Sequence, residues 1–182
     1  MSGSEWAWYF HCFCEENIYR FIEKSNLSKD TLYAVFISNL SKSVALFEQK
    51  SAKGRDPVIW DYHVVCIHES ETKCFVYDAD TRLKCPEDLE TYFLRTFPLS
   101  IPDLFRPKFR VVPGATFLAS FSSDRSHMKS AHVPFPTLAV IQGNSAESSM
   151  TLPRFWNMVC DLDSEHYGKV MELEELLKRF SR

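Results

Sequence analysis

Apolar residues first recur at helical spacing directly after Cys14. Ile18, Phe21 and Ile22 share one face with Cys14, and two glutamates follow it in what would be the first helical turn. Acidic residues in a first turn are favoured by the helix dipole. The pattern predicts a helix that begins at Cys14 and turns the thiol toward the body of the protein.

Four short apolar runs follow this helix, at residues 32–37, 43–47, 58–67 and 74–77. Polar segments rich in turn-forming residues separate the runs. Short apolar runs bounded in this way are typical of buried strands. We therefore predict four strands, with a meander as the simplest order and a hairpin that turns about residues 69–72.

The second half of the chain mixes helices with a strand and a long loop. A helix is predicted to open at Pro86 with its apolar face ending near Phe97, and a strand at residues 109–112. Residues 122–143 form an irregular segment, which we interpret as a long ordered loop. Helices around residues 152–159 and 173–180 complete the pattern.

These elements place the protein in the α+β class, with a mostly antiparallel sheet covered by helices. The 182 residues are 45% hydrophobic, enough for a sizeable core, whereas two independent domains would be cramped. We expect a single catalytic domain over residues 1–182.

The charge balance gives little support for a nucleic-acid partner. Lys and Arg number 21 and Asp and Glu 24, for a net charge of −3, so no field attracts a polyanion. The basic residues Arg106, Lys108 and Arg110 alternate along one segment. Alternation places them on one side of a strand, which we interpret as a solvated face.

The termini and cysteines indicate an intracellular protein. The aromatic run near the N-terminus lacks a positive flank and is too short for a signal peptide or a membrane span. The six cysteines are expected to be mostly reduced thiols. We therefore expect the protein in the cytosol or the nucleus, without membrane attachment.

Candidate chemistry centres on Cys14 and His63. A catalytic cysteine needs a nearby imidazole and a polar group that orients that imidazole. If residues 58–67 form one strand, His63 lies on an apolar face, and a hairpin turning about residues 69–72 places it opposite Asp78. The same register would oppose Asp61 with Asp80, so Asp80 remains a second candidate for orienting His63.

Spacing alone leaves other interpretations open. Cys14 fits a buried helix-face cysteine and His63 a hydrogen-bonded core histidine. A zinc site from His11, Cys12, Cys14 and His63 is conceivable, although C-x-C lacks the usual knuckle spacing. His68 would point to the opposite strand face, and His11, His127, His132 and His166 lack a comparable partner. No glycine-rich nucleotide-binding pattern is present.

Five stretches together resemble one known family. They are C-F-C-E-E-N at 12–17, V-I-W-D-Y-H-V-V at 58–65, Y-D-A-D-T at 77–81, K-F-R-V at 108–111 and S-D-R-S-H-M-K at 123–129. In this order they resemble the protein N-terminal glutamine amidohydrolases and span nearly the whole chain. The sequence departs from the family pattern at 131–136, where a proline-rich loop is reduced, and at 166–168.

The resemblance implies an α-β-α layered fold similar to papain-like and transglutaminase-like hydrolases. It assigns the nucleophile to Cys14, the catalytic histidine to His63 and the aspartate to Asp78. The implied reaction converts the N-terminal glutamine of proteins or peptides to glutamate and ammonia through a thioester, as in N-degron pathways. Neither cofactor nor metal is implied, and we expect a monomer.

Recognition of a free N-terminus requires an acceptor for the α-ammonium group, since an unpaired carboxylate would reject blocked substrates. We consider Asp124 and Glu16 for this role and Trp60 as a further substrate contact. Two other functions remain open: acyl transfer or proteolysis by the same triad, and a non-catalytic reader of protein N-termini.

Overall fold

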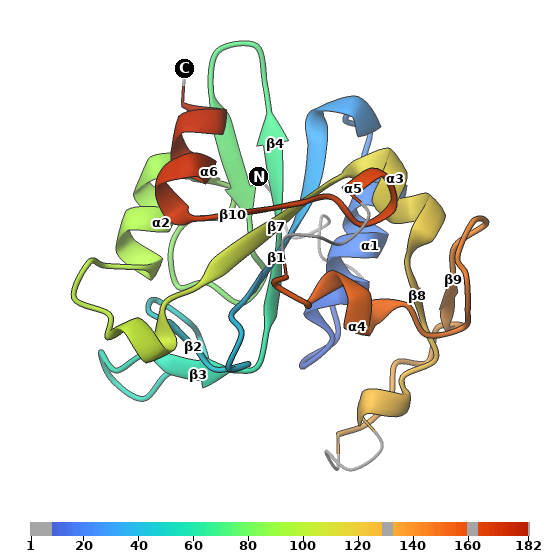
Figure 1. The fold of residues 1–182 in the computed structure, drawn as a ribbon, viewed down its shortest axis with the longest axis horizontal. Helices are drawn as coiled ribbons and strands as arrows, with labels where there is room; N and C mark the ends of the chain where they lie inside the picture. Colours follow the sequence, from blue (N-terminus) through green and yellow to red (C-terminus); the bar gives the residue numbers. More distant parts are fainter. Residues whose placement is uncertain (1–8, 129–132, 160–163, 182) are drawn as a thin grey trace.

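Six strands form the central sheet in the computed structural model of the protein, which describes residues 9–128, 133–159 and 164–181 (Figure 1). Every pair of neighbouring strands is antiparallel, in the order β10-β7-β1-β4-β5-β6. The strands are β1 (Leu32–Ser38), β4 (His63–Glu69), β5 (Cys74–Tyr77), β6 (Glu87–Asp88), β7 (Lys108–Pro113) and β10 (Lys169–Met171). The predicted α+β class with an antiparallel sheet is confirmed.

Helices cover both faces of this sheet. One face packs against α1 (Cys14–Lys24), α3 (Gly114–Ser120), α4 (Leu152–Phe155) and α5 (Ser164–Tyr167), and the other against α2 (Leu89–Thr96) and α6 (Leu173–Phe180) (Figure 1). Strand β1 alternates between the two cores, with Phe36 in the first and Val35 in the second. The described residues thus form three layers. Within them, no helix has the length and hydrophobicity needed to cross a bilayer.

Small elements complete the described chain. Two two-stranded ribbons lie outside the main sheet, one formed by β2 (Val44–Leu46) with β3 (Val58–Trp60) and one by β8 (Ser122–Ser123) with β9 (Ile141–Gln142). The 3₁₀ helices are η1 (Lys29–Thr31), η2 (Asp103–Phe105) and η3 (Ser126–Met128). His132 and Cys160, together with part of the segment 131–136, lie outside the described residues. The other five cysteines are free thiols.

The predicted strand 58–67 is in fact two strands in different sheets. Strand β3 ends at Trp60 and β4 begins at His63. At the break, the Asp61 carbonyl accepts the Ser38 hydroxyl and the Asp61 carboxylate accepts the Tyr62 N–H. Side chains thus replace the ladder there. The meander is wrong as well, because β2 and β3 leave the main sheet and β1 lies between β4 and β7.

The hairpin of β4 and β5 has a register two residues away from the predicted one. Cys66 pairs with Tyr77, because the turn is closed between Ser70 and Lys73 rather than one residue earlier. A shift by two keeps every side chain on its face. The β4–β5 ladder ends at Cys66, before His63, and along the other edge of β4 His63 pairs with Ile37 of β1.

Several elements of the second half differ from the prediction. Strand β6 separates Pro86 from α2, which begins only at Leu89, and the Asp88 side chain caps this helix by accepting the Thr91 N–H. Helix α4 ends at Phe155, short of the predicted 159. The helices α3 and α5 and the strand β10 were not predicted. Residues 122–143 are irregular as predicted, apart from β8, η3 and β9.

The expected solvated face at residues 106–110 is wrong for Arg110, which is fully buried. Its guanidinium group donates to the backbone carbonyls of Asn157 (3.0 Å), Gly168 (3.1 Å) and Val159 (3.1 Å). These charge-assisted bonds offset the cost of burying the cation. They also attach the chain after α4 to strand β7. Lys108, two residues earlier, is partly exposed and pairs with Glu172.

Arg110→Ala should lower the free energy of unfolding by about 3 kcal/mol or more, because it leaves several buried carbonyls without donors. Lys108→Ala is the matched control on the same strand face, and its loss should stay below about 1 kcal/mol. Urea unfolding of both variants measures the difference. Equal losses would show that Arg110 does not anchor the C-terminal segment.

Candidate active site

A cavity of about 370 Å³ opens where the start of α1 meets strands β3 and β4. Its lining brings together residues from distant parts of the sequence: His11, Cys12, Cys14, Ser51, Val58, Trp60, Asp61, Tyr62, His63, Asp80, His127, Met128 and Trp156. Cys14 and His63 therefore face the same space. A concave site lined by a thiol and an imidazole is suited to nucleophilic chemistry.

Cys14 lies at the first position of α1, as predicted, and is partly buried. Burial raises the pKa of its thiol well above the usual value, and the carboxylates of Glu15 and Asp80 raise it further. The backbone N–H of Val64 acts in the opposite direction and lowers the pKa. An isolated Cys14 would therefore remain a thiol, and forming the thiolate requires a neighbouring cation.

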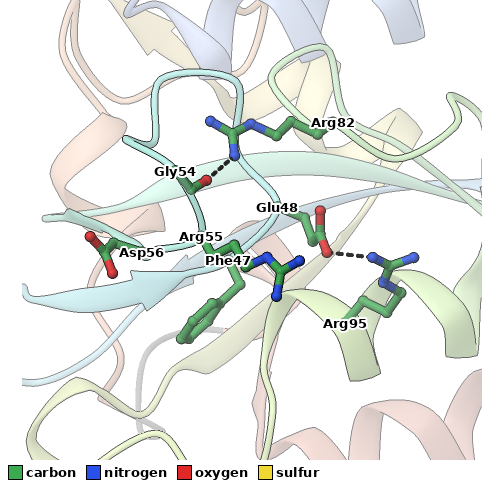
Figure 2. A pocket seen from close by; sticks show the side chains of 7 residues that line it. All are labelled: Phe47, Glu48, Gly54, Arg55, Asp56, Arg82 and Arg95. Carbon is green, nitrogen blue, oxygen red and sulfur yellow. Dashed lines mark hydrogen bonds and ion pairs between the residues drawn. The ribbon is translucent and has the colours of Figure 1, made fainter.

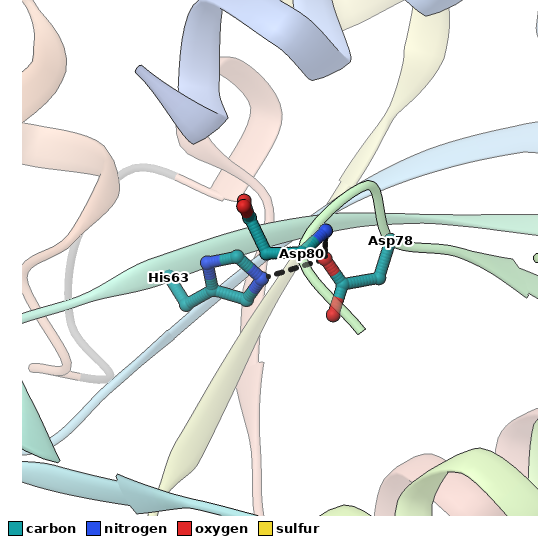
Figure 3. A group of neighbouring side chains, drawn as sticks. All are labelled: His63, Asp78 and Asp80. Carbon is teal, nitrogen blue, oxygen red and sulfur yellow. Dashed lines mark hydrogen bonds and ion pairs between the residues drawn. The ribbon is translucent and has the colours of Figure 1, made fainter. Parts of the chain in front are cut away.

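His63 forms a buried pair with Asp78, as Figure 3 shows. Its Nε2 lies 3.0 Å from Asp78 Oδ1, and both side chains are at most 2% exposed. Burial by itself lowers the pKa of His63, but the attraction and the hydrogen bond of Asp78 outweigh it and raise the pKa overall. The predicted contact is confirmed, although it forms just beyond the end of the β4–β5 ladder.

Three further donors hold the Asp78 carboxylate. Tyr92 Oη donates to Oδ2 at 2.8 Å and Gln49 Nε2 to the same atom at 3.4 Å, while the Asp80 N–H donates to Oδ1 at 2.9 Å. Burial favours the neutral carboxyl group, but His63 and these donors lower the pKa of Asp78 overall. The carboxylate is thus fixed in charge and in orientation, and the His63 ring is fixed with it.

Sequence reasoning missed Tyr92 and Gln49. A tyrosine on a buried helix face needs a partner for its hydroxyl, so Tyr92 carried a usable signal. Gln49 carried none, since it lies in the irregular segment after β2, where an isolated bridge pairs it with Thr81, and its hydrogen bond to Asp78 joins residues far apart in the sequence.

Two aromatic residues of the W-D-Y-H-V stretch flank the imidazole and the thiol. The Trp60 ring packs on the His63 ring with 4.6 Å between centroids. Tyr62 donates its hydroxyl to Glu15 Oε2 at 3.0 Å, and His127 Nε2 lies 3.5 Å from Glu15 Oε1. His127 thus lines the cavity, although the sequence alone had offered no partner for it.

Comparison with known proteins shows the family to which the chain belongs. A family described as N-terminal glutamine amidase matches residues 9–180. This chain belongs to that family. A protein N-terminal glutamine amidohydrolase of Homo sapiens is 38% identical over 183 residues, which cover 94% of this chain and 87% of the relative. Those of Danio rerio (37%; 94% and 88%) and Caenorhabditis elegans (36%; 100% of each chain) are similar to it as well.

Two residues considered for substrate recognition in this amidase lie outside the cavity lining. Glu16 is buried and forms a bidentate ion pair with Arg125, at 2.6 Å and 2.8 Å. Asp124 is exposed, and its carboxylate accepts the Ser126 N–H at 2.9 Å. Trp60, the third residue considered, does line the cavity.

One group within the described residues of the amidase has metal-ligating geometry. His63, Asp78 and Asp80 each offer a ligand atom within 4.8 Å of the others. His63 Nε2 and both oxygens of Asp78 already take part in hydrogen bonds within the protein. His11 and Cys12, considered with Cys14 and His63 for zinc, are not part of this group.

A second pocket of about 560 Å³ lies beside the loop that joins β2 and β3 (Figure 2). Arg55, Arg82 and Arg95 line it with two acidic side chains. Arg82 donates to the Gly54 carbonyl and Arg95 to Glu48, both at 2.5 Å. The residues that line it include neither a cysteine nor a histidine, so this pocket offers no thiol nucleophile and no imidazole base.

The free energy of unfolding of the amidase should depend on pH through the His63–Asp78 pair. The raised pKa of His63 stabilises the fold below its ordinary value of 6.5, and this contribution is lost as pH rises through the raised pKa. The lowered pKa of Asp78 stabilises the fold above its ordinary value of 3.8, and this contribution is lost as pH falls through the lowered pKa.

Asp78→Asn removes both contributions. The difference in unfolding free energy between wild type and variant should therefore be largest between pH 3.8 and 6.5 and decrease above that range. Urea unfolding at a series of pH values measures it, with the exposed Asp61→Asn as control. A difference that grows steadily from pH 6.5 to the alkaline side would contradict the pairing.

Proposed function

We propose that this protein hydrolyses the side-chain amide of an N-terminal glutamine on proteins or peptides, producing glutamate and ammonia. The observation that carries the proposal is the cavity in which Cys14 meets His63, with His63 held by the buried Asp78. The family membership supplies the substrate class, because the relatives are named for this reaction. We further propose a monomeric, single-domain enzyme in the cytosol or the nucleus.

In the first half-reaction, His63 takes the proton of Cys14 and the thiolate attacks the carboxamide carbon of glutamine. The C–N bond then breaks, and the His63 imidazolium gives its proton to the departing nitrogen, which leaves as ammonia. The acyl group remains on Cys14 as a thioester. The raised pKa of His63 suits this step, because it keeps the proton available for the leaving group.

In the second half-reaction, neutral His63 takes a proton from water, whose oxygen attacks the thioester carbon. The C–S bond breaks and the thiol is restored as glutamate leaves. Asp78 keeps the imidazole in one orientation and stabilises its charged form in both steps. Negative charge on the substrate oxygen is stabilised by backbone N–H groups at the start of α1, where no side chain caps the helix.

Incubation of the protein with a Gln-initiated peptide should release ammonia and convert the amide to the acid, as followed by an ammonia assay and peptide mass. An Asn-initiated peptide should react much more slowly, because its carboxamide lies one methylene short of the thiol. A cross-linked product with an added primary amine would instead indicate acyl transfer. Binding without turnover would indicate a reader of N-termini.

Cys14→Ala should lower turnover at least about 1000-fold, because the covalent route needs the thiol. Cys12→Ala is the matched control, since Cys12 lines the same cavity and is exposed. Its activity should remain within about tenfold of wild type. Loss of activity in Cys12→Ala with retention in Cys14→Ala would reverse the assignment.

His63→Ala should be about as damaging as Cys14→Ala, and the double variant should be no worse than either, because residues of one catalytic unit lose activity non-additively. Steady-state kinetics of the three variants measure this. Losses that multiply in the double variant would contradict a shared unit.

A further inference from the structure

The proposed function leaves one requirement open, namely how the enzyme distinguishes an N-terminal glutamine from an internal one. The distinguishing group is the α-ammonium, and its recognition calls for a carboxylate inside the cavity. Two lining residues carry one, Asp61 and Asp80. We propose that Asp80 accepts the α-ammonium group of the substrate and thereby sets the specificity for protein N-termini. This inference rests on the proposed function.

The two carboxylates differ in their exposure to solvent. Asp61 is exposed, and one of its oxygens accepts the N–H of the adjacent Tyr62 at 2.9 Å. Water screens an ion pair at such a position. Asp80 is partly buried, next to the catalytic pair. A pair formed there with a substrate cation is screened less and contributes more to binding.

The length of a glutamine side chain fits the distance to Asp80. The reacting carbon must lie beside His63, and four bonds of about 1.5 Å separate it from the α-nitrogen, a span of roughly 5 Å when extended. An Asp80 carboxylate oxygen lies within 4.8 Å of a His63 ligand atom. The α-nitrogen of a bound glutamine can therefore reach hydrogen-bonding distance of Asp80, and Cys14 and Asp80 would hold the two ends of the side chain.

The surroundings of Asp80 leave its carboxylate ready for a ligand. Its backbone N–H donates to Asp78 and its carbonyl accepts the Lys50 N–H at 2.7 Å, so the main chain is fixed. Tyr9 donates its hydroxyl to Oδ1 at 2.5 Å. Among the described residues, no donor reaches Oδ2. In Figure 3 the Asp80 carboxylate points away from that of Asp78, so the two acids face different partners.

The charge of the site also favours a cationic substrate. Glu15 and Asp80 both oppose ionisation of Cys14 and raise the pKa of its thiol. A substrate ammonium group at Asp80 would offset that opposition and bring the pKa of the thiol down. Free N-terminal substrates would then help to activate the nucleophile, whereas N-acetylated ones would not.

Three peptides test the inference: a Gln-initiated peptide, its N-acetyl form, and a des-amino form in which a hydrogen replaces the α-amine. Wild type should prefer the free amine over the des-amino form by about 10- to 100-fold in kcat/KM, as expected for a charge-assisted bond. Asp80→Asn should bring that ratio close to one. Asp61→Asn, the matched control in the same cavity, should keep the wild-type ratio.

An unchanged ratio in Asp80→Asn would overturn the inference. This includes the case in which Asp80→Asn slows the free-amine and des-amino peptides equally, because Asp80 would then act only through the charge of His63. If Asp80→Asn fails to fold, Tyr9→Phe provides the second test and should lower the ratio in part; an unchanged ratio there would count against the inference. Wild type that releases no ammonia from any peptide would overturn the proposed function itself.

Discussion

The buried pair of His63 and Asp78 is the interaction on which the rest of the site depends. An ionised carboxylate without exposed surface is costly unless hydrogen bonds compensate it. Here the compensation comes from three places in the chain, through Gln49, Tyr92 and the backbone of Asp80. The loop after β2, helix α2 and the turn after β5 are thus held in one arrangement. That arrangement fixes the imidazole next to Cys14.

The sheet supplies the rigidity that this pair needs. Strand β4 lies between β1 and β5 and is buried over most of its length, so the His63 backbone has little freedom. The break at Asp61 and Tyr62 separates β3 from β4, and it allows Trp60 to pack on the imidazole while Tyr62 reaches Glu15. A continuous strand would have placed these two residues on one face, because its side chains alternate.

The spacing of apolar residues predicted correctly the helices and strands whose formation depends on nearby residues. The helix at Cys14, the strand at residues 32–37 and the helix at residues 173–180 follow from apolar spacing, and the structure confirms them. The contact of His63 with Asp78 was predicted from a register that is two residues off. It held because a shift by two preserves the face of the sheet.

What could not be predicted depends on contacts between distant segments. Arg110 is buried because carbonyls of residues 157, 159 and 168 converge on it, and no spacing in the sequence reveals this. Glu16 is paired with Arg125 for a similar reason. The sequence shows the charge of such a residue but does not show which distant residue it contacts. Sequence spacing alone therefore does not show which carboxylates line the cavity.

We propose that Cys14, His63 and Asp78 act together through an acyl-enzyme. The most direct test mixes the protein with a Gln-initiated peptide, quenches with acid within the first turnover, and measures the intact mass. This mechanism predicts an adduct equal to the peptide minus ammonia, mapped to Cys14, that decays as glutamate forms. Ammonia release with no adduct on Cys14 at any time, or an adduct on another residue, would contradict it.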